Sequence, residues 1–188
     1  MSLKHLRNSQ KVYLKDWENS LLDLTPVVTS TGYLSYLEYL NVECKIAITK
    51  EINELCHDRK EKYYSSEPPT LNMIMSKKYN KLFIRQINTN KNYLKPPPLE
   101  VSCFNGWLGK ALNLSNDQYV GIDPDSTYFN DDYFFIEAAA ELIPFKDNQF
   151  NTVLSKDSID HYYDIKKAIN EIYRVLKPGG HFILGLQV

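Results

Sequence analysis

The spacing of hydrophobic and polar positions changes near the middle of the chain. Before residue 88, apolar residues recur at intervals of three and four, which is typical of amphipathic helices. After residue 98, they gather in short runs that are separated by helical or turn segments. The stretch between, NTNKNYLKPPP, is rich in asparagine and proline, which disfavour regular structure. We therefore expect an N-terminal cap segment and linker over residues 1–95 and a second domain over residues 96–188.

Two parts of the N-terminal segment carry helical patterns. Residues 31–64 have apolar positions at near-helical intervals and predict one or two helices. The charged residues at the end of this stretch predict a solvated helix face, and a surface that binds a partner is the alternative. Residues 67–87 predict a helix with Thr70 as its N-cap after two prolines. A β-hairpin that turns at residues 77–80 is also compatible with this sequence.

The second half of the chain predicts alternating strands and helices. Parallel strands need connections long enough to hold a helix, so this alternation favours an α/β fold with a parallel sheet. The clearest helix has one apolar face formed by Ile165, Ile169, Ile172 and their neighbours, and the Lys-Pro-Gly at residues 177–179 ends it. Five runs are candidate strands: LEVSC (99–103), QYVGID (118–123), YFFIEA (133–138), FNTVLS (150–155) and HFILGLQV (181–188).

Charge and composition make nucleic-acid, membrane and metal binding less expected for this chain. The formal net charge is -1, whereas proteins that bind nucleic acid or anionic membranes are usually basic, so we expect neither partner. No apolar run approaches the roughly 20 residues that span a bilayer, and the start of the chain lacks a signal-peptide core, so we expect a cytoplasmic protein. The three cysteines lack metal-type spacing, which indicates small apolar core residues and no metal site.

Asp123 is the first candidate binding residue. It ends the run YVGID, about twenty residues after a turn that contains glycine. In nucleotide-binding βαβ units, a carboxylate at this place accepts hydrogen bonds from ribose hydroxyls. Because Asp123 precedes PDS, a simple turn-forming role fits as well.

Three later motifs identify a family resemblance. AELIPFKDNQF before the fourth run, SIDHYYD after it and EIYRVLKPGG before the fifth occur in this order, and together they resemble class I S-adenosylmethionine-dependent methyltransferases with a type 11 methyltransferase domain. The resemblance covers about residues 97–188. It implies a Rossmann-like three-layer sandwich with a mainly parallel sheet in the order 3-2-1-4-5, here preceded by a helical N-terminal segment.

The resemblance also assigns roles to the stretch LEVSCFNG. Glu100 falls on the family's acidic position, Ser102 and Phe104 on its first two glycines, and Gly106 on the third. The resemblance thus implies that Glu100, Ser102, Gly106 and Asp123 bind the cofactor. A left-handed backbone at Phe104 would be strained by about 1–2 kcal/mol, and its ring could fill the pocket.

A further departure from the family lies after the third strand. The family usually has an acidic residue there that binds the adenine amino group, and the matching position is Ala139. Glu137 and Glu141, two residues to either side, are the candidates to replace it, and we include Glu141 in the predicted cofactor site.

The loop after the fourth strand faces substrate in this family. His161 is our candidate general base, with Asp160 or Asp157 to position it, because imidazole accepts protons near neutral pH. A role in capping or packing is the alternative for His161, since methyl transfer relies mainly on the alignment of the reacting groups. We expect Tyr162 and Tyr163 to cover the edge of the core.

The resemblance implies a cytoplasmic enzyme that uses S-adenosylmethionine, without a metal, to methylate a small molecule. The missing glycines favour an alternative, a catalytically silent scaffold or partner-binding protein. The family usually continues beyond the fifth strand with further strands, which the sequence lacks. Three explanations for the open strand edge are cover by the N-terminal segment, a homodimer through that edge, and truncation.

Overall fold

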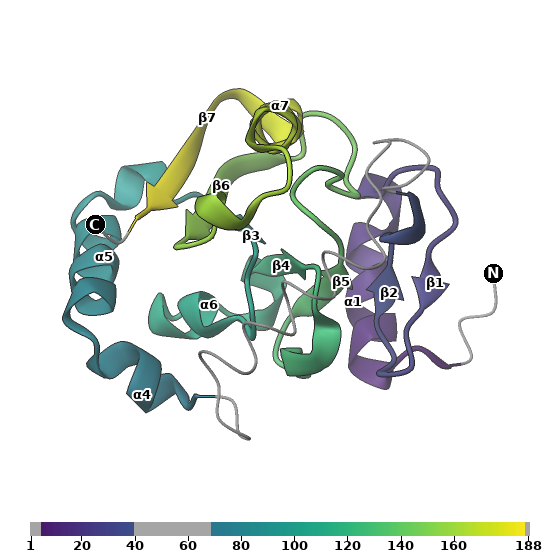
Figure 1. Ribbon diagram of the computed structural model, residues 1–188, viewed down its shortest axis with the longest axis horizontal. Helices are drawn as coiled ribbons and strands as arrows, with labels where there is room; N and C mark the ends of the chain where they lie inside the picture. Colours follow the sequence, from purple (N-terminus) through teal and green to yellow (C-terminus); the bar gives the residue numbers. More distant parts are fainter. Residues whose placement is uncertain (1–4, 40–68, 187–188) are drawn as a thin grey trace.

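The computed structural model describes residues 5–39 and 69–186. Within them, a seven-stranded sheet has the order β1-β2-β5-β4-β3-β6-β7 (Figure 1). The strands are β1 (Val27–Val28), β2 (Leu34–Ser35), β3 (Leu99–Val101), β4 (Val120–Asp123), β5 (Phe134–Glu137), β6 (Phe150–Lys156) and β7 (Leu176–Gly185). The α-helices are α1 (Asn8–Trp17), α4 (Leu71–Ser76), α5 (Lys78–Thr89), α6 (Trp107–Ala111) and α7 (Ile165–Val175).

The predicted α/β class and the order of the five predicted strands are confirmed. Strands β5, β4, β3, β6 and β7 lie side by side in parallel, which is the expected order 3-2-1-4-5. The sheet is larger than predicted, because β2 pairs in parallel with β5 and β1 pairs antiparallel with β2. Each of these two strands has only two residues, which is too short for a periodic pattern to reveal.

The N-terminal segment is therefore only partly helical. The helical prediction for residues 31–64 is wrong at Leu34–Ser35, which form β2, and its part over residues 40–64 lies outside the described residues. The predicted helix over residues 67–87 is confirmed as two helices, α4 and α5, and the hairpin alternative is wrong. The helices separate at Lys77, whose backbone is extended, and Thr70 caps α4 by accepting the Met73 N–H.

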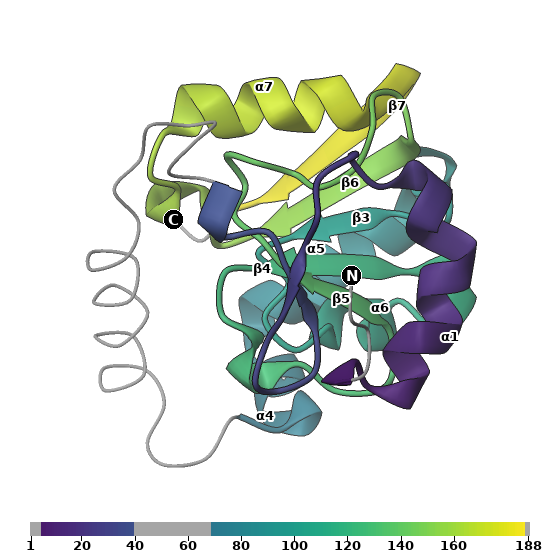
Figure 2. The same cartoon turned by 90° about the vertical axis from the view of Figure 1, so that its right-hand side faces the viewer.

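Helices cover both faces of the central sheet (Figure 2). On one face, Trp17 at the end of α1 and the apolar stripe of α7 pack on the side chains of β3, β4, β5 and β6. On the other face, α4, α5 and α6 form a second cluster with Leu154 of β6. This arrangement is the three-layer sandwich that the resemblance implied.

The last strand begins earlier than predicted. Helix α7 ends at Val175, and β7 starts at Leu176 instead of residue 181. Leu176 pairs with Phe150 and His181 pairs with Thr152, so β7 carries a bulge between these pairs. Gly179 adopts a left-handed backbone within that bulge, so the Lys-Pro-Gly motif ends the helix as predicted but lies inside the strand.

A side-chain amide covers part of the β5 edge. Gln10 of α1 is fully buried; its amide nitrogen donates to the Tyr133 carbonyl, and its carbonyl accepts the Phe135 N–H. The side chain thus completes the hydrogen bonds of β5 where β2 does not reach. Among the described helices, none has the length and hydropathy needed to cross a membrane.

Candidate functional site

The candidate site lies where the carboxyl ends of β3, β4 and β6 meet. Because these strands are parallel neighbours, their following loops emerge at one edge of the sheet. The loops contain residues 102–106, 124–128 and 157–164. They bring Ser102 and Asp123, predicted to bind the cofactor, to the same edge as the 157–164 loop, predicted to face the substrate.

The loop after β3 keeps the backbone of a glycine-rich turn without its first two glycines. Ser102, Phe104 and Gly106 have φ angles of 61°, 55° and 72°, all in the left-handed region. A side chain in that region strains the backbone by about 1–2 kcal/mol, so both Ser102 and Phe104 are strained. At Gly106, an added Cβ would lie 2.7 Å from Cζ of Phe135, so steric overlap as well as the positive φ angle favours glycine there.

Asp123 holds this loop against β4. Its Oδ2 accepts the Phe104 N–H at 2.9 Å, and its Oδ1 accepts the Asp125 N–H at 3.0 Å. The side chain is half-buried at the end of the strand. A carboxylate oxygen can accept more than one hydrogen bond, so Asp123 can bond ligand hydroxyls in addition to these amides.

Two aromatic rings from the loops after β3 and β4 contact each other. The ring of Phe104 lies 4.6 Å from the ring of Tyr128, centroid to centroid, at an interplanar angle of 44°. Both residues are half-buried, and Phe104 also packs against the cluster formed by α4, α5 and α6. The residue that replaces the second glycine therefore bonds the predicted ribose anchor through its backbone and places its ring on Tyr128.

Glu100 lies inside the fold, beneath this loop. It is 1% exposed and accepts a short hydrogen bond from the hydroxyl of Tyr119. Burial raises the pKa of Glu100 to about 8, because a charged carboxylate loses its water shell there; the hydrogen bond from Tyr119 opposes this shift, and the charge of Asp123 adds to it. Burial likewise raises the pKa of Tyr119 well above its ordinary value.

Hydroxyl groups gather between the loop after β3 and the loop after β6. Ser155 Oγ lies 2.6 Å from Ser158 Oγ and 2.8 Å from the hydroxyl of Tyr162. Burial raises the pKa of the Tyr162 phenol, whereas hydrogen bonds from Ser155, Ser158 and Ser102 lower it. The hydroxyls of Ser155, Ser158 and Tyr162 thus form one hydrogen-bonded cluster at the carboxyl end of β6.

Glu141 is close to the site but is bonded to the chain before α7. Its Oε1 accepts the backbone N–H groups of Tyr163 at 2.5 Å and of Asp164 at 3.0 Å. Ala139 is buried, and Glu137 accepts a 2.7 Å hydrogen bond from Ser126 Oγ. Both glutamates that could replace the missing acidic residue thus bind groups of the protein.

His161 and Asp160 lie together on the loop after β6. Nε2 of His161 is 3.6 Å from Oδ2 of Asp160, and their side chains are 37% and 70% exposed. The same loop begins with Asp157, which forms a short ion pair with the buried Lys156. Within residues 5–39 and 69–186, no three histidine, cysteine, aspartate or glutamate side chains are grouped in a way that could hold a metal ion.

The sequence did not single out Tyr128, Ser155 or Ser158. Tyr128 lies in an unremarked turn, and the two serines are small polar residues in a strand and a loop. Tyr128 contacts Phe104, which is distant in the sequence, whereas the partners of Ser155 lie within seven residues and are brought to it by the turn after β6.

Solved structures with a similar chain path include methyltransferases. A S-adenosylmethionine-dependent methyltransferase of Thermotoga maritima, described as a possible histamine N-methyltransferase, is 23% identical with a TM-score of 0.47, over 56% of this chain and 52% of that one. The YcgJ protein of Bacillus subtilis is also 23% identical, with a TM-score of 0.49, over 56% of this chain and 50% of that one.

Similarity to curated proteins is concentrated in a short part of the chain. The ubiquinone/menaquinone biosynthesis C-methyltransferase UbiE of Brucella canis is 47% identical over 53 residues, which is 28% of this chain and 20% of that protein. The Escherichia coli protein YafE is 47% identical over 45 residues, 24% of this chain and 22% of its own length. The matched part thus spans about a fifth of these relatives.

The family comparison covers the parallel sheet. Residues 99–184, from the start of β3 almost to the end of β7, match the sequence model of the methyltransferase domain Methyltransf_11. This range contains the left-handed loop, Asp123 and the hydroxyl cluster. Residues 99–184 of this chain thus resemble a methyltransferase domain in sequence, and the match covers a little less than half of the chain.

Proposed function

We propose that this chain transfers a methyl group from S-adenosylmethionine to a small-molecule acceptor. The observation that supports this most is the position of Asp123, half-buried at the end of β4 and bonded to a loop with left-handed backbone at three alternating residues. A carboxylate at the end of the second parallel strand, beside such a loop, is suited to accept ribose hydroxyls. The family match supplies the cofactor's identity.

The residues present fit the cofactor at its ribose and along the loop backbone. We assign the ribose hydroxyls to Asp123 and the methionyl part to the backbone of residues 102–106. Glu100 and Glu141 already bind Tyr119 and the chain before α7, so we assign them to holding the loops in place. When bound, S-adenosylmethionine supplies a methyl group on a positively charged sulfur, and the transfer leaves neutral S-adenosylhomocysteine.

His161 provides the proton acceptor in this proposal. An acceptor hydroxyl or amine that gives its proton to the imidazole becomes the better nucleophile, and its lone pair forms the new bond to the methyl carbon. Asp160, at 3.6 Å, would stabilise the resulting imidazolium.

The test is calorimetric titration of the full chain with S-adenosylmethionine and S-adenosylhomocysteine. We expect micromolar binding that is lost in Asp123→Ala and kept in Asp132→Ala, which removes a surface carboxylate paired with Lys110. Circular dichroism would establish that both variants are folded. Absence of heat with the wild-type protein, or equal binding by Asp123→Ala, would contradict the proposal.

A second candidate function, a silent methyltransferase-like protein that binds a partner, is favoured by the Phe104–Tyr128 ring pair beside Asp123. If these rings fill the cofactor site, the wild-type protein will bind neither ligand, and Phe104→Gly will gain binding because the ring and the strain are both removed. If the chain is a methyltransferase, the wild-type protein binds without that change. The same titration therefore separates the two functions.

A further inference from the structure

The outer edge of β7 has open backbone hydrogen-bonding groups. No other strand in the described ranges pairs with this edge, since β6 pairs with β7 only from the inner side. The Gly185 carbonyl accepts the Asp157 N–H, so Gly185 faces inward. Peptide groups of successive residues in a strand point to opposite sides, and Phe182 and Leu184 therefore direct their N–H and C=O groups outward.

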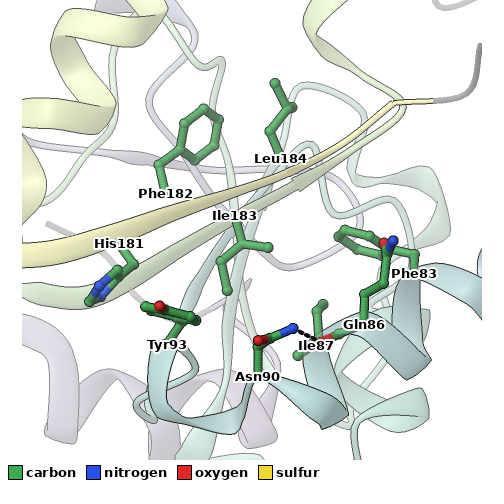
Figure 3. A pocket seen from close by; sticks show the side chains of 9 residues that line it. All are labelled: Phe83, Gln86, Ile87, Asn90, Tyr93, His181, Phe182, Ile183 and Leu184. Atoms are coloured by element: carbon green, nitrogen blue, oxygen red, sulfur yellow. Dashed lines mark hydrogen bonds between the residues drawn. The ribbon is translucent and has the colours of Figure 1, made fainter.

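A groove of about 470 Å³ runs along this edge. Helix α5 and the turn η3 (Lys91–Tyr93) form its wall, and Figure 3 shows His181 and Ile183 pointing toward that wall while Phe182 and Leu184 point to the opposite face of the sheet. Among the described residues, no aspartate, glutamate, lysine or arginine lines the groove. The lining residues are Phe83, Gln86, Ile87, Asn90, Tyr93, His181, Phe182, Ile183 and Leu184.

These features determine what kind of polypeptide segment the groove can bind. An open strand edge pairs with another extended backbone, and the apolar floor of Phe83, Ile87 and Ile183 favours an uncharged apolar side chain. The side-chain amides of Gln86 and Asn90 are exposed at the rim and can bond peptide groups. The matching occupant is a neutral, apolar, extended segment.

The strand β7 is itself such a segment. Its residues 181–185 read His-Phe-Ile-Leu-Gly, and the following Leu186 is 55% exposed. We propose that the occupant is the β7 strand of a second copy of this chain, paired antiparallel about a two-fold axis at Ile183. The net charge of -1 per chain opposes such self-association only weakly.

The symmetric register is compatible with the side chains. With Ile183 on the axis, Phe182 faces Leu184 of the partner subunit, and their outward peptide groups bond to each other. Directly opposite residues share a face of the sheet, so both Ile183 side chains lie on the α5 side, over the groove. His181 faces Gly185 of the partner subunit, which has no side chain and leaves room for the imidazole and the Tyr93 ring that it contacts.

The test combines sedimentation equilibrium and hydrogen exchange on the full chain. We expect a monomer–dimer equilibrium in the micromolar range, with the Phe182 and Leu184 amides exchanging more slowly as the protein concentration rises. Gln86→Lys places an ammonium group at the rim of the apolar groove, so we expect it to weaken the dimer by about tenfold or more. Leu184→Pro removes one outward N–H and should act in the same direction.

Asn88→Lys is the matched control, because Asn88 is exposed on the same helix but does not line the groove. A monomer with rapid exchange at Phe182 and Leu184 would overturn the proposal. So would slow exchange independent of concentration, which would mean that the edge is covered within one molecule. A dimer that both groove variants leave intact would place the interface elsewhere. None of these outcomes depends on cofactor binding.

Discussion

Gly106 and Gly179 have almost the same backbone conformation but different surroundings. Their φ angles are 72° and 76°. A Cβ at Gly106 would contact the rings of Phe135 and Tyr133 within 3.0 Å, whereas a Cβ at Gly179 would meet nothing within 4 Å. This pair therefore separates backbone strain from steric overlap.

We expect Gly179→Ala to reduce the free energy of unfolding by about 1 kcal/mol, from backbone strain alone. Gly106→Ala adds steric overlap in a packed core, so we expect a loss of about 3 kcal/mol. Urea denaturation of both variants measures the difference. Equal losses would show that the aromatic rings move aside at no cost.

Glu100 makes the stability depend on pH. Its pKa is about 8 in the folded protein and about 4.5 in an exposed chain. Between these values the folded state keeps a proton that the unfolded state has released, so the free energy of unfolding falls as the pH rises from 4.5 to about 8. Below this range both states are protonated, and above it both are ionised, so Glu100 adds no slope there.

Glu100→Gln should remove this contribution, because an amide does not ionise and can still accept the Tyr119 hydroxyl. We expect the variant to be more stable than the wild type at the upper end of that pH range and to lose less stability across it. Urea denaturation at several pH values measures both. Parallel pH profiles for the two proteins would mean that Glu100 is ionised in the fold.

At the level of elements, one side-chain amide of α1 adds hydrogen bonds to the apolar packing of this helix on the sheet. Gln10 satisfies the carbonyl of Tyr133, just before β5, and the N–H of Phe135 within it, and both residues are buried. Gln10→Leu would leave these two backbone groups without a partner, and each unsatisfied buried group costs about 1–3 kcal/mol. We expect a loss of about 2–5 kcal/mol by urea denaturation. Lys15→Ala, an exposed change on the same helix, is the control, and similar small losses for both would contradict this role.

The elements differ in how well their own residues predict them. Helix α7 has a strong apolar stripe, an Asp164 N-cap and a Lys-Pro-Gly stop, and these local signals place it correctly. The strands β1 and β2 have no such signals, since they exist only because β5 offers an edge on which they pair. Helices α4 and α5 are intermediate: their helical pattern is visible, but the break at Lys77 is not.

At the scale of the whole molecule, the two outer strands of the five-stranded parallel core, β5 and β7, differ in what covers them. The β5 edge is covered by β2 and by Gln10 of the N-terminal segment, whereas α5 and η3 stand beside the β7 edge without pairing to it. One explanation for the open edge of β7 was that N-terminal residues cover it. Among the described residues, the N-terminal strands pair with β5, on the opposite side of the sheet. The homodimer remains our proposal for β7.

The α/β class could be predicted from the sequence alone, because local periodicity and helix caps act between residues close in the chain. The order of the five central strands came from the family resemblance that the three motifs carry, and the structure added the left-handed backbone at Ser102 and Phe104. The burial of Glu100 against Tyr119, the packing of Phe104 on Tyr128 and the bond from the Phe104 N–H to Asp123 arise only in the folded chain. Those contacts join residues from different strands and loops, and their chemistry depends on burial, which no single stretch of sequence specifies.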